Sequence, residues 1–284
     1  MKLSGYGKNE WLTAIAISIL LIATCILFDF WYLSFVVLLA LTFVIQFFRD
    51  PDRRIPSQRG VAVAPCDGKV TSIHEIEEYE PFGNQPAVCI RIFMSVFNVH
   101  VNRSPCHGRV QTITHTPGKH TNTLNPNCCE INERNLILMT HPTKGHPVAA
   151  VRQIAGLLAR TICCAVDEGQ VIQRGQRIGM IKLGSTTELY IPKTLLDKVV
   201  VEEGQTAYGG LTVLAQVKSQ DHTQPASTVI TDSKDDTPDE SANLETSETE
   251  EVKETTEITD KSEQQQDAEK SEETKEEAET TEKE

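Results

Sequence analysis

The N-terminal part of the chain carries an apolar run that no water-exposed surface can accommodate. The 38 residues from Trp11 to Phe48 include one charged residue, Asp29, which separates two apolar halves of 18 residues each. As an α-helix each half would rise about 27 Å, just short of a hydrocarbon core of about 30 Å. We therefore expect residues 1–48 to form an α-helical membrane anchor. Two short passes and a hairpin that enters one leaflet both fit this pattern.

The charges around the apolar run predict its orientation. Lys2 and Lys8 precede the run, and arginines follow it at positions 49, 53, 54 and 59. Positive residues concentrate on the cytoplasmic side of membrane segments, so both ends of the anchor are expected at the cytoplasmic face of the cell membrane. A cleaved signal peptide would have a shorter apolar region followed by a small-residue cleavage site, and this sequence has neither.

The C-terminal segment, residues 219–284, has a different composition from the rest. It holds 23 Asp and Glu residues against 6 Lys and has no aromatic side chain, so the net charge of −13 of the whole chain originates there. Such a segment buries too little apolar surface to offset the entropy lost on ordering, and we expect a disordered acidic tail. The remaining residues carry a small positive balance without a concentrated basic face, which argues against nucleic acid as a partner.

The eight cysteines do not form a recognisable metal or disulfide framework. They lie at positions 25, 66, 89, 106, 128, 129, 163 and 164, and no two of them make a CxxC pair. A folded part of this size can be stabilised by its core alone. We expect reduced thiols in a cytosolic domain and no metal site.

The segment between anchor and tail, residues 49–218, reads as mainly β. Short stretches rich in β-branched residues, such as 87–93, 135–139 and 159–166, are bounded by Gly or Pro. A repeat relates 166–170 to 201–205 at a spacing of 35 residues, and Gly175 and Gly210 share that spacing. Paired hairpins with glycines in tight turns resemble the biotinyl/lipoyl hammerhead, so we expect a hammerhead-like β-sandwich.

Three residues in this segment could carry chemistry together. His100 ends an apolar strand, Asp67 lies in a glycine turn, and Ser185 follows Gly184 in another turn. Each alone is more often structural, because buried histidines, turn aspartates and Gly-Ser turns are common. Together a Ser, a His and an Asp can act as nucleophile, base and orienting group when the fold brings them into reach.

Six sequence blocks around these residues carry a family resemblance. They read FFRDPDRRIP from Phe47, VAPCDGKV, IFMSVFNVHVNRSPCHGRV, NERN, QIAGLLAR and GQRIGMIKLGSTTELYIP. In content and order they resemble the phosphatidylserine decarboxylases of the short, bacterial and archaeal type. The two-pass anchor agrees with that family, whereas the acidic tail is not part of its pattern.

The resemblance implies a self-processing lyase that depends on a pyruvoyl group. In that reading Ser185 attacks the carbonyl of Gly184, with His100 as base and Asp67 orienting it, and the chain is cut between residues 184 and 185. The β fragment (1–184) and the α fragment (185–284) stay paired. The residue at position 185 becomes a covalent pyruvoyl cofactor that supports decarboxylation of phosphatidylserine to phosphatidylethanolamine in phospholipid biosynthesis.

The sequence also departs from the family pattern. Leu183 to Thr186 is closer to the LGST of the longer class than to the Phe-Gly-Ser of the short one, and Phe97 stands where that longer class has a second His. Lys69 and Arg103 are candidate contacts to the charged headgroup of the membrane phospholipid. A reading as ordinary solvated charges fits these two cations equally well.

Two alternative functions stay open on the sequence alone. Archaetidylserine has the same reacting headgroup, so the predicted catalytic residues do not separate it from phosphatidylserine. A membrane-tethered carrier or adaptor of the hammerhead type, with Lys198 as the modified residue, is the alternative without catalysis, and it leaves most of the six blocks without a role. The sequence does not indicate whether the paired fragments assemble further.

Overall fold

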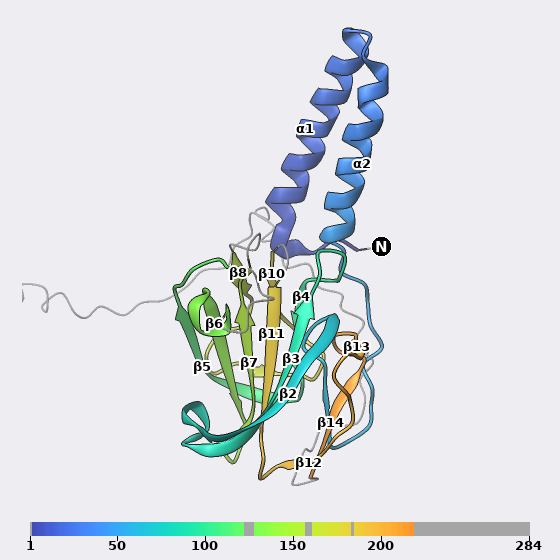
Figure 1. Ribbon diagram of the computed structural model, residues 1–284. Helices are drawn as coiled ribbons and strands as arrows, with labels where there is room; N and C mark the ends of the chain where they lie inside the picture. Colours follow the sequence, from blue (N-terminus) through green and yellow to red (C-terminus); the bar gives the residue numbers. More distant parts are fainter. Residues whose placement is uncertain (1, 122–127, 157–160, 183–184, 219–284) are drawn as a thin grey trace, which may run out of the picture. The chain divides into compact units, whose positions relative to one another are not determined.

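The computed structural model describes residues 2–121, 128–156, 161–182 and 185–218 (Figure 1). The predicted acidic tail, 219–284, and the residue before the predicted cleavage point, Gly184, lie outside these described residues. The domain boundaries at 48 and 218 stay predictions, although the last strand of the described chain ends at Val217.

The apolar N-terminal run forms two helices, as predicted. Helix α1 spans Lys8–Leu27 and helix α2 spans Trp31–Phe47, and Figure 1 shows them side by side. The chain reverses at Asp29, which adopts a left-handed conformation with φ 63°. The segment Gly5–Leu27 is long and apolar enough to cross a membrane, whereas α2 has 17 residues and would rise about 25 Å.

Most of the remaining described chain is β-structure. The short helical elements are the 3₁₀ turns η1 (Gly5–Gly7) and η2 (Glu80–Phe82) and the helix α3 (Cys128–Ile131). The strands are β1 (Val61–Val63), β2 (Gly68–Tyr79), β3 (Gln85–Met94), β4 (Val101–Arg103), β5 (Gly108–Thr116), β6 (Arg134–Thr140), β7 (Pro147–Ile154), β8 (Ile162–Cys164), β9 (Val171–Ile172), β10 (Arg177–Ile181), β11 (Ser185–Pro192), β12 (Leu196–Val199), β13 (Thr206–Ala207) and β14 (Val213–Val217). The mainly β class predicted from the sequence is confirmed.

The strands pair antiparallel in one large and two small sheets. The large sheet has the order β13-β2-β3-β11-β7-β6-β5-β9, and the small ones have the orders β1-β14-β12 and β4-β10-β8. Alternate side chains of a strand point to opposite faces, so Leu189 and Ile191 of β11 enter the main core while Tyr190 lies on the other face. The main core also contains side chains of both small sheets, such as Ile178 and Leu214.

The 35-residue repeat of the sequence is also a repeat of backbone structure. Gly169 and Gly204 adopt nearly the same left-handed conformation, with φ 84° and φ 88°. Their N–H groups donate to the carbonyls of Val110 and Val70, at 2.7 and 2.8 Å. A positive φ costs glycine little, which explains why glycine stands at both positions.

The strands that accept these hydrogen bonds belong to a second repeat that our sequence analysis overlooked. Residues 65–70 read PCDGKV and residues 105–110 read PCHGRV. In both copies the glycine pairs with a short strand that follows one copy of the 35-residue repeat. Gly68 pairs with Ala207 of β13, and Gly108 pairs with Ile172 of β9. The two halves therefore share a backbone pattern but differ in the residue before the glycine, an Asp in one copy and a His in the other.

The two halves meet at one side chain of the segment that follows α2. A Cβ added to Gly175 (φ 79°) would lie 2.3 Å from Cδ1 of Ile55, and a Cβ added to Gly210 (φ 76°) would lie 2.9 Å from the same atom. Glycine is required at both positions because the close approach of Ile55 leaves no room for a side chain. The segment after the anchor is thereby packed between the two halves.

This packing predicts unequal effects of two glycine substitutions. Gly175→Ala adds both conformational strain and a clash with a stiff, β-branched side chain, whereas Gly169→Ala (φ 84°) adds strain alone because nothing lies within 4 Å of its Cβ position. We expect Gly169→Ala to cost about 1 kcal/mol and Gly175→Ala about 1–3 kcal/mol more. Urea unfolding in detergent would measure both, and equal losses would contradict the proposed packing of Ile55.

Candidate active site

Ser185 is the first residue of β11 and is fully buried. It lies opposite Met94 in the pairing of β11 with β3, and its Oγ is 4.0 Å from the Met94 Sδ atom. Two strands flank β11 in the large sheet, since β3 pairs with it on one side and β7 on the other. The predicted nucleophile therefore starts the central part of the sheet rather than lying in an open loop.

His100 lies directly before β4 and is also fully buried. Its Nδ1 is 2.9 Å from the carbonyl oxygen of Asn98, and the ring of Phe47, the last residue of α2, packs on the imidazole with centroids 4.4 Å apart. A carbonyl oxygen only accepts hydrogen bonds, so Nδ1 carries the proton and the lone pair of the neutral ring is on Nε2. Burial lowers the pKa of His100 to about 4, so at neutral pH the imidazole has the form that a general base needs.

The backbone of His100 is bound to the segment that leads to Ser185. The N–H of Ile181, at the end of β10, donates to the carbonyl of His100 at 3.3 Å. Val101 pairs with Met180 in the small sheet formed by β4, β10 and β8. Ser185 follows Ile181 by four residues, so the fold brings the predicted base and the predicted nucleophile to the same end of β10 and β11.

The loop before His100 is fixed by an asparagine and touches the end of the anchor. The side-chain oxygen of Asn98 accepts from both the N–H and the hydroxyl of Ser95, at 2.9 and 2.7 Å. Phe97 at the tip is 70% exposed and meets Phe43 of α2 edge to face at 6.1 Å. Arg49, just after α2, donates to the carbonyl of Phe97 at 2.6 Å. The loop that precedes His100 is thus attached to the end of α2.

Asp67 is buried in an ion pair with Arg53. Its two carboxylate oxygens are 2.5 and 2.7 Å from the Arg53 guanidinium, and the N–H of Gly209 donates to the same carboxylate at 2.7 Å. Among the described residues, these bonds account for the hydrogen bonds of the carboxylate, so the structure does not join Asp67 to His100 directly. The charge of Asp67 still acts on His100 and raises its pKa, an effect smaller than the lowering by burial.

Arg103 belongs to a second buried ion-pair group. Asp50 accepts from Arg103 at 3.0 Å through one carboxylate oxygen and from Arg177 at 2.5 Å through the other. Arg103 is 4% exposed and also donates to the carbonyl of Gly175 at 3.0 Å. Protein groups therefore surround this guanidinium, whereas Lys69 is exposed at the start of β2. The assignment of either residue to the substrate headgroup stays a prediction.

The sequence analysis missed a layer of buried amide side chains beside this site. Asn135, Gln153 and Asn102 are each at most 2% exposed and are linked by hydrogen bonds. The burial of Gln153 could have been predicted from its position in a strand. Gln153 lies on the same face of β7 as Val151, and side chains on that face enter the core. Thr187 of β11 pairs with Gln153 in the sheet and is also fully buried.

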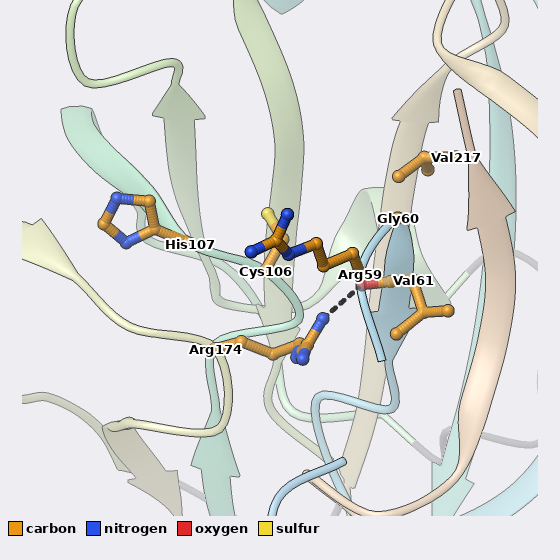
Figure 2. A pocket seen from close by; sticks show the side chains of 7 residues that line it. All are labelled: Arg59, Gly60, Val61, Cys106, His107, Arg174 and Val217. Carbon is orange, nitrogen blue, oxygen red and sulfur yellow. Dashed lines mark hydrogen bonds between the residues drawn. The ribbon is translucent and has the colours of Figure 1, made fainter. Parts of the chain in front are cut away.

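His107, the counterpart of Asp67 in the other half, is at the edge of a small pocket (Figure 2). Its lining residues are Arg59, Gly60, Val61, Cys106, His107, Arg174 and Val217. Arg174 donates to the carbonyl of Val61 at 3.3 Å. None of the predicted catalytic residues lines this pocket.

The cysteines at positions 66, 89 and 106 are buried thiols that form no disulfide. Burial raises the pKa of the Cys106 thiol to about 12, which keeps it protonated. In the part of the chain that the structure describes, no group of three or more His, Cys, Asp or Glu side chains could hold a metal ion.

Comparison with known proteins now gives the family. Residues 40–215 match the family model described as "Phosphatidylserine decarboxylase". The chain belongs to the phosphatidylserine decarboxylase family. It is 42% identical over 209 residues to the phosphatidylserine decarboxylase proenzyme of Oleidesulfovibrio alaskensis, covering 74% of this chain and 91% of that protein. It is 39% identical over 213 residues to the proenzyme of Carboxydothermus hydrogenoformans, covering 75% and 96%.

Membership confirms the resemblance drawn from the six sequence blocks. The enzyme decarboxylates phosphatidylserine in phospholipid biosynthesis and is a lyase with a covalent pyruvoyl group made from a serine of its own chain. As a proenzyme it is cleaved into two chains. A pyruvoyl-forming serine needs a base and shielding from water, and the predicted residues Ser185 and His100 are both fully buried.

The burial of His100 predicts its titration. The pKa of about 4 in the folded chain lies below the ordinary 6.5, so between these values the unfolded chain binds more protons. The stability due to the neutral imidazole is complete above pH 6.5 and is lost as pH falls toward 4, by about 1.4 kcal/mol per pH unit within that window. Histidine NMR, assigned with His100→Gln, would measure the pKa.

The stacked ring of Phe47 provides the matched test. Phe47→Ala lets water reach the imidazole and should raise the pKa of His100 toward 6.5. A wild-type pKa between 6 and 7, or no change in Phe47→Ala, would show that burial does not set the protonation state of His100.

Proposed function

We propose that the chain cleaves itself between Gly184 and Ser185 and that the resulting pyruvoyl group at position 185 decarboxylates phosphatidylserine at the cytoplasmic face of the cell membrane. One observation supports this most: a fully buried serine and a fully buried, neutral histidine lie at the adjoining ends of β11 and β10. The proposed roles are Ser185 as nucleophile, His100 as base and Asp67 as the group that favours the protonated imidazole.

Cleavage begins with an N-to-O acyl shift. His100 Nε2 takes the proton of the Ser185 hydroxyl while Oγ bonds to the carbonyl carbon of Gly184. The C–N bond then breaks, and the freed nitrogen receives the proton from His100, which leaves an ester between residues 184 and 185. Loss of the proton on Cα of residue 185 expels residue 184 as a carboxylate and leaves a dehydroalanine with a free amino group. This enamine tautomerises to an imine, and hydrolysis of the C=N bond releases ammonia and leaves the pyruvoyl group.

Asp67 is proposed to act on these cleavage steps through its charge. While His100 holds the proton it is a cation in a buried site, and a nearby carboxylate lowers the cost of that state. Arg53 and the Gly209 amide hold the Asp67 side chain in place. The orientation of the imidazole itself comes from the carbonyl of Asn98, a role that the sequence analysis gave to Asp67.

The chemistry of turnover needs few further groups. The pyruvoyl group supplies a ketone that binds the substrate amine and accepts the electrons released as CO2 departs. We propose that His100 also holds the proton that the product then needs. The exposed Lys69 is a candidate contact to the phosphodiester.

The anchor is proposed to hold the active site against the bilayer. Both helices expose large apolar side chains, such as Leu20 (67%) and Phe35 (72%), which need an apolar environment. Phe97 continues that surface beside His100, and the arginines from Arg49 onward favour anionic headgroups. The β-body behind the site is proposed to be a hammerhead-like sandwich, supported by the repeated glycine turns around Ile55.

Substitution at the cleavage point tests the proposal. The wild type should run as fragments 1–184 and 185–284, whereas Ser185→Ala should stay one inactive chain. His100→Ala should slow cleavage by about 10²–10⁴, the usual contribution of a general base, and Asp67→Asn should slow it too. Asp197→Asn, at an exposed position of β12, is the control for charge loss and should cleave normally. Gel analysis and the mass of the smaller fragment give the result, and full decarboxylase activity in uncleaved Ser185→Ala would refute the mechanism.

A pair of truncations separates anchoring from the packing of Phe47. A chain that begins at Phe47 keeps the ring that covers His100 and should still cleave itself while losing its sedimentation with vesicles. A chain that begins at Arg49 lacks Phe47 and Phe48, which pack on Met180, and should cleave more slowly. Equal cleavage rates would show that the ring does not assist the base, and vesicle binding by both chains would show that α1 and α2 are not the anchor.

A further inference from the structure

A line of buried amides crosses the core and ends near the nucleophile. Asn135 Nδ2 on β6 donates to Gln153 Oε1 on β7 at 3.1 Å, and Gln153 Nε2 donates to Asn102 Oδ1 on β4 at 2.7 Å. Gln153 and Asn102 are fully buried and Asn135 is 2% exposed. These bonds fix the orientation of the Asn102 amide, because its oxygen must face Gln153 and its NH₂ group must face the opposite way.

The NH₂ group of Asn102 has a poor partner. Its Nδ2 lies 3.8 Å from the Met94 Sδ atom, which is its hydrogen-bond partner among the described residues. A thioether sulfur is a weak acceptor, so a strong, fully desolvated donor is left largely unsatisfied. Buried donors in native proteins are nearly always paired, and an unsatisfied one beside a reacting group calls for an acceptor that appears during the reaction.

The position of Ser185 indicates what that acceptor is. Ser185 Oγ lies 4.0 Å from the same Met94 sulfur, so the nucleophile and the Asn102 donor converge on one atom. His100 precedes Asn102 by two residues, the spacing that puts side chains on one side of an extended chain. The nucleophile and the poorly satisfied donor therefore lie next to one sulfur atom, and the proposed base is two residues from that donor.

We propose that Asn102 is the oxyanion donor of the self-cleavage step, with Gln153 and Asn135 as its positioning residues; this rests on the proposed cleavage between residues 184 and 185. As Ser185 Oγ bonds to the carbonyl carbon, the carbonyl π electrons move onto its oxygen, and the Asn102 N–H donates to that oxygen. When the C–N bond breaks, the electrons return to the carbonyl and the nitrogen takes the proton held by His100. No group beyond the chain is needed.

The test follows cleavage of freshly translated full-length chain in the presence of vesicles. Asn102→Leu keeps the volume and removes the donor, and we expect cleavage to slow by about 10²–10³, as when one oxyanion donor is lost elsewhere. Gln153→Met leaves Asn102 in place without its restraint and should slow cleavage less. Asn132→Leu is the matched control: this amide is also fully buried, bonds to the carbonyl of Ala155 at 2.8 Å, and lies outside the line, so its cleavage rate should stay within a few-fold of the wild type.

Hydroxylamine distinguishes the step that Asn102 serves. It cleaves esters, so it rescues a variant that has completed the acyl shift and is blocked afterwards, and it should not rescue Asn102→Leu. Wild-type cleavage in Asn102→Leu, or rescue of that variant by hydroxylamine, would overturn the proposal.

If Asn102→Leu does not fold, Gln153→Met decides, because a wild-type cleavage rate in Gln153→Met would show that the amide line does not position the donor. Ser185→Ala in the same series distinguishes the two proposals. Cleavage of Ser185→Ala would refute the proposed cleavage between residues 184 and 185. Normal cleavage of Asn102→Leu would refute only the role of Asn102 as oxyanion donor.

Discussion

The buried ion pairs of the segment after α2 are the interactions on which the rest of the structure depends. Asp50 joins Arg103 and Arg177, from β4 and β10, and Arg53 joins the turn of Asp67. Removing one member of such a pair leaves an uncompensated charge away from water and costs about 3–5 kcal/mol. Because Ile55 then enters between two glycines of the repeat, a short stretch of extended chain connects the anchor to both halves of the β-body.

The active site combines this charged support with a dry reaction centre. The carboxylates and guanidiniums neutralise one another in buried ion pairs. Ser185 is fully buried with its Oγ near the Met94 thioether, and the His100 imidazole is stacked on Phe47. Exclusion of water favours the intramolecular acyl shift over hydrolysis of the scissile bond. The same exclusion keeps His100 unprotonated, so burial serves both the direction of the reaction and the state of the base.

Local patterns in the sequence predicted a large share of this. The apolar run indicated both helices and their break at Asp29, and the 35-residue repeat indicated the paired glycine turns, since each depends on residues close together in the chain. The six blocks around Asp67, His100 and Ser185 indicated the family. The partner of Asp67, in contrast, is fixed by how residues 49–56 fold back, and the contacts among Asn102, Gln153 and Asn135 arise only when β4, β6 and β7 come together. No spacing along the sequence encodes such pairings. The similarity of residues 65–70 to residues 105–110 can be recognised from the sequence alone, but our sequence analysis overlooked it.

The central place of β11 has a consequence for the life of the enzyme. Residues 186–190 pair with β7 and residues 185–192 pair with β3. The proposed cleavage before Ser185 would therefore leave the α fragment hydrogen-bonded on both sides to strands of the β fragment. The cofactor is thus made where it is used and cannot be exchanged for a fresh one. An enzyme that binds a dissociable cofactor can be reloaded after a side reaction, but each polypeptide of this enzyme receives one reactive group. Catalytic capacity at the membrane is therefore set by the rate at which new chains are synthesised and mature.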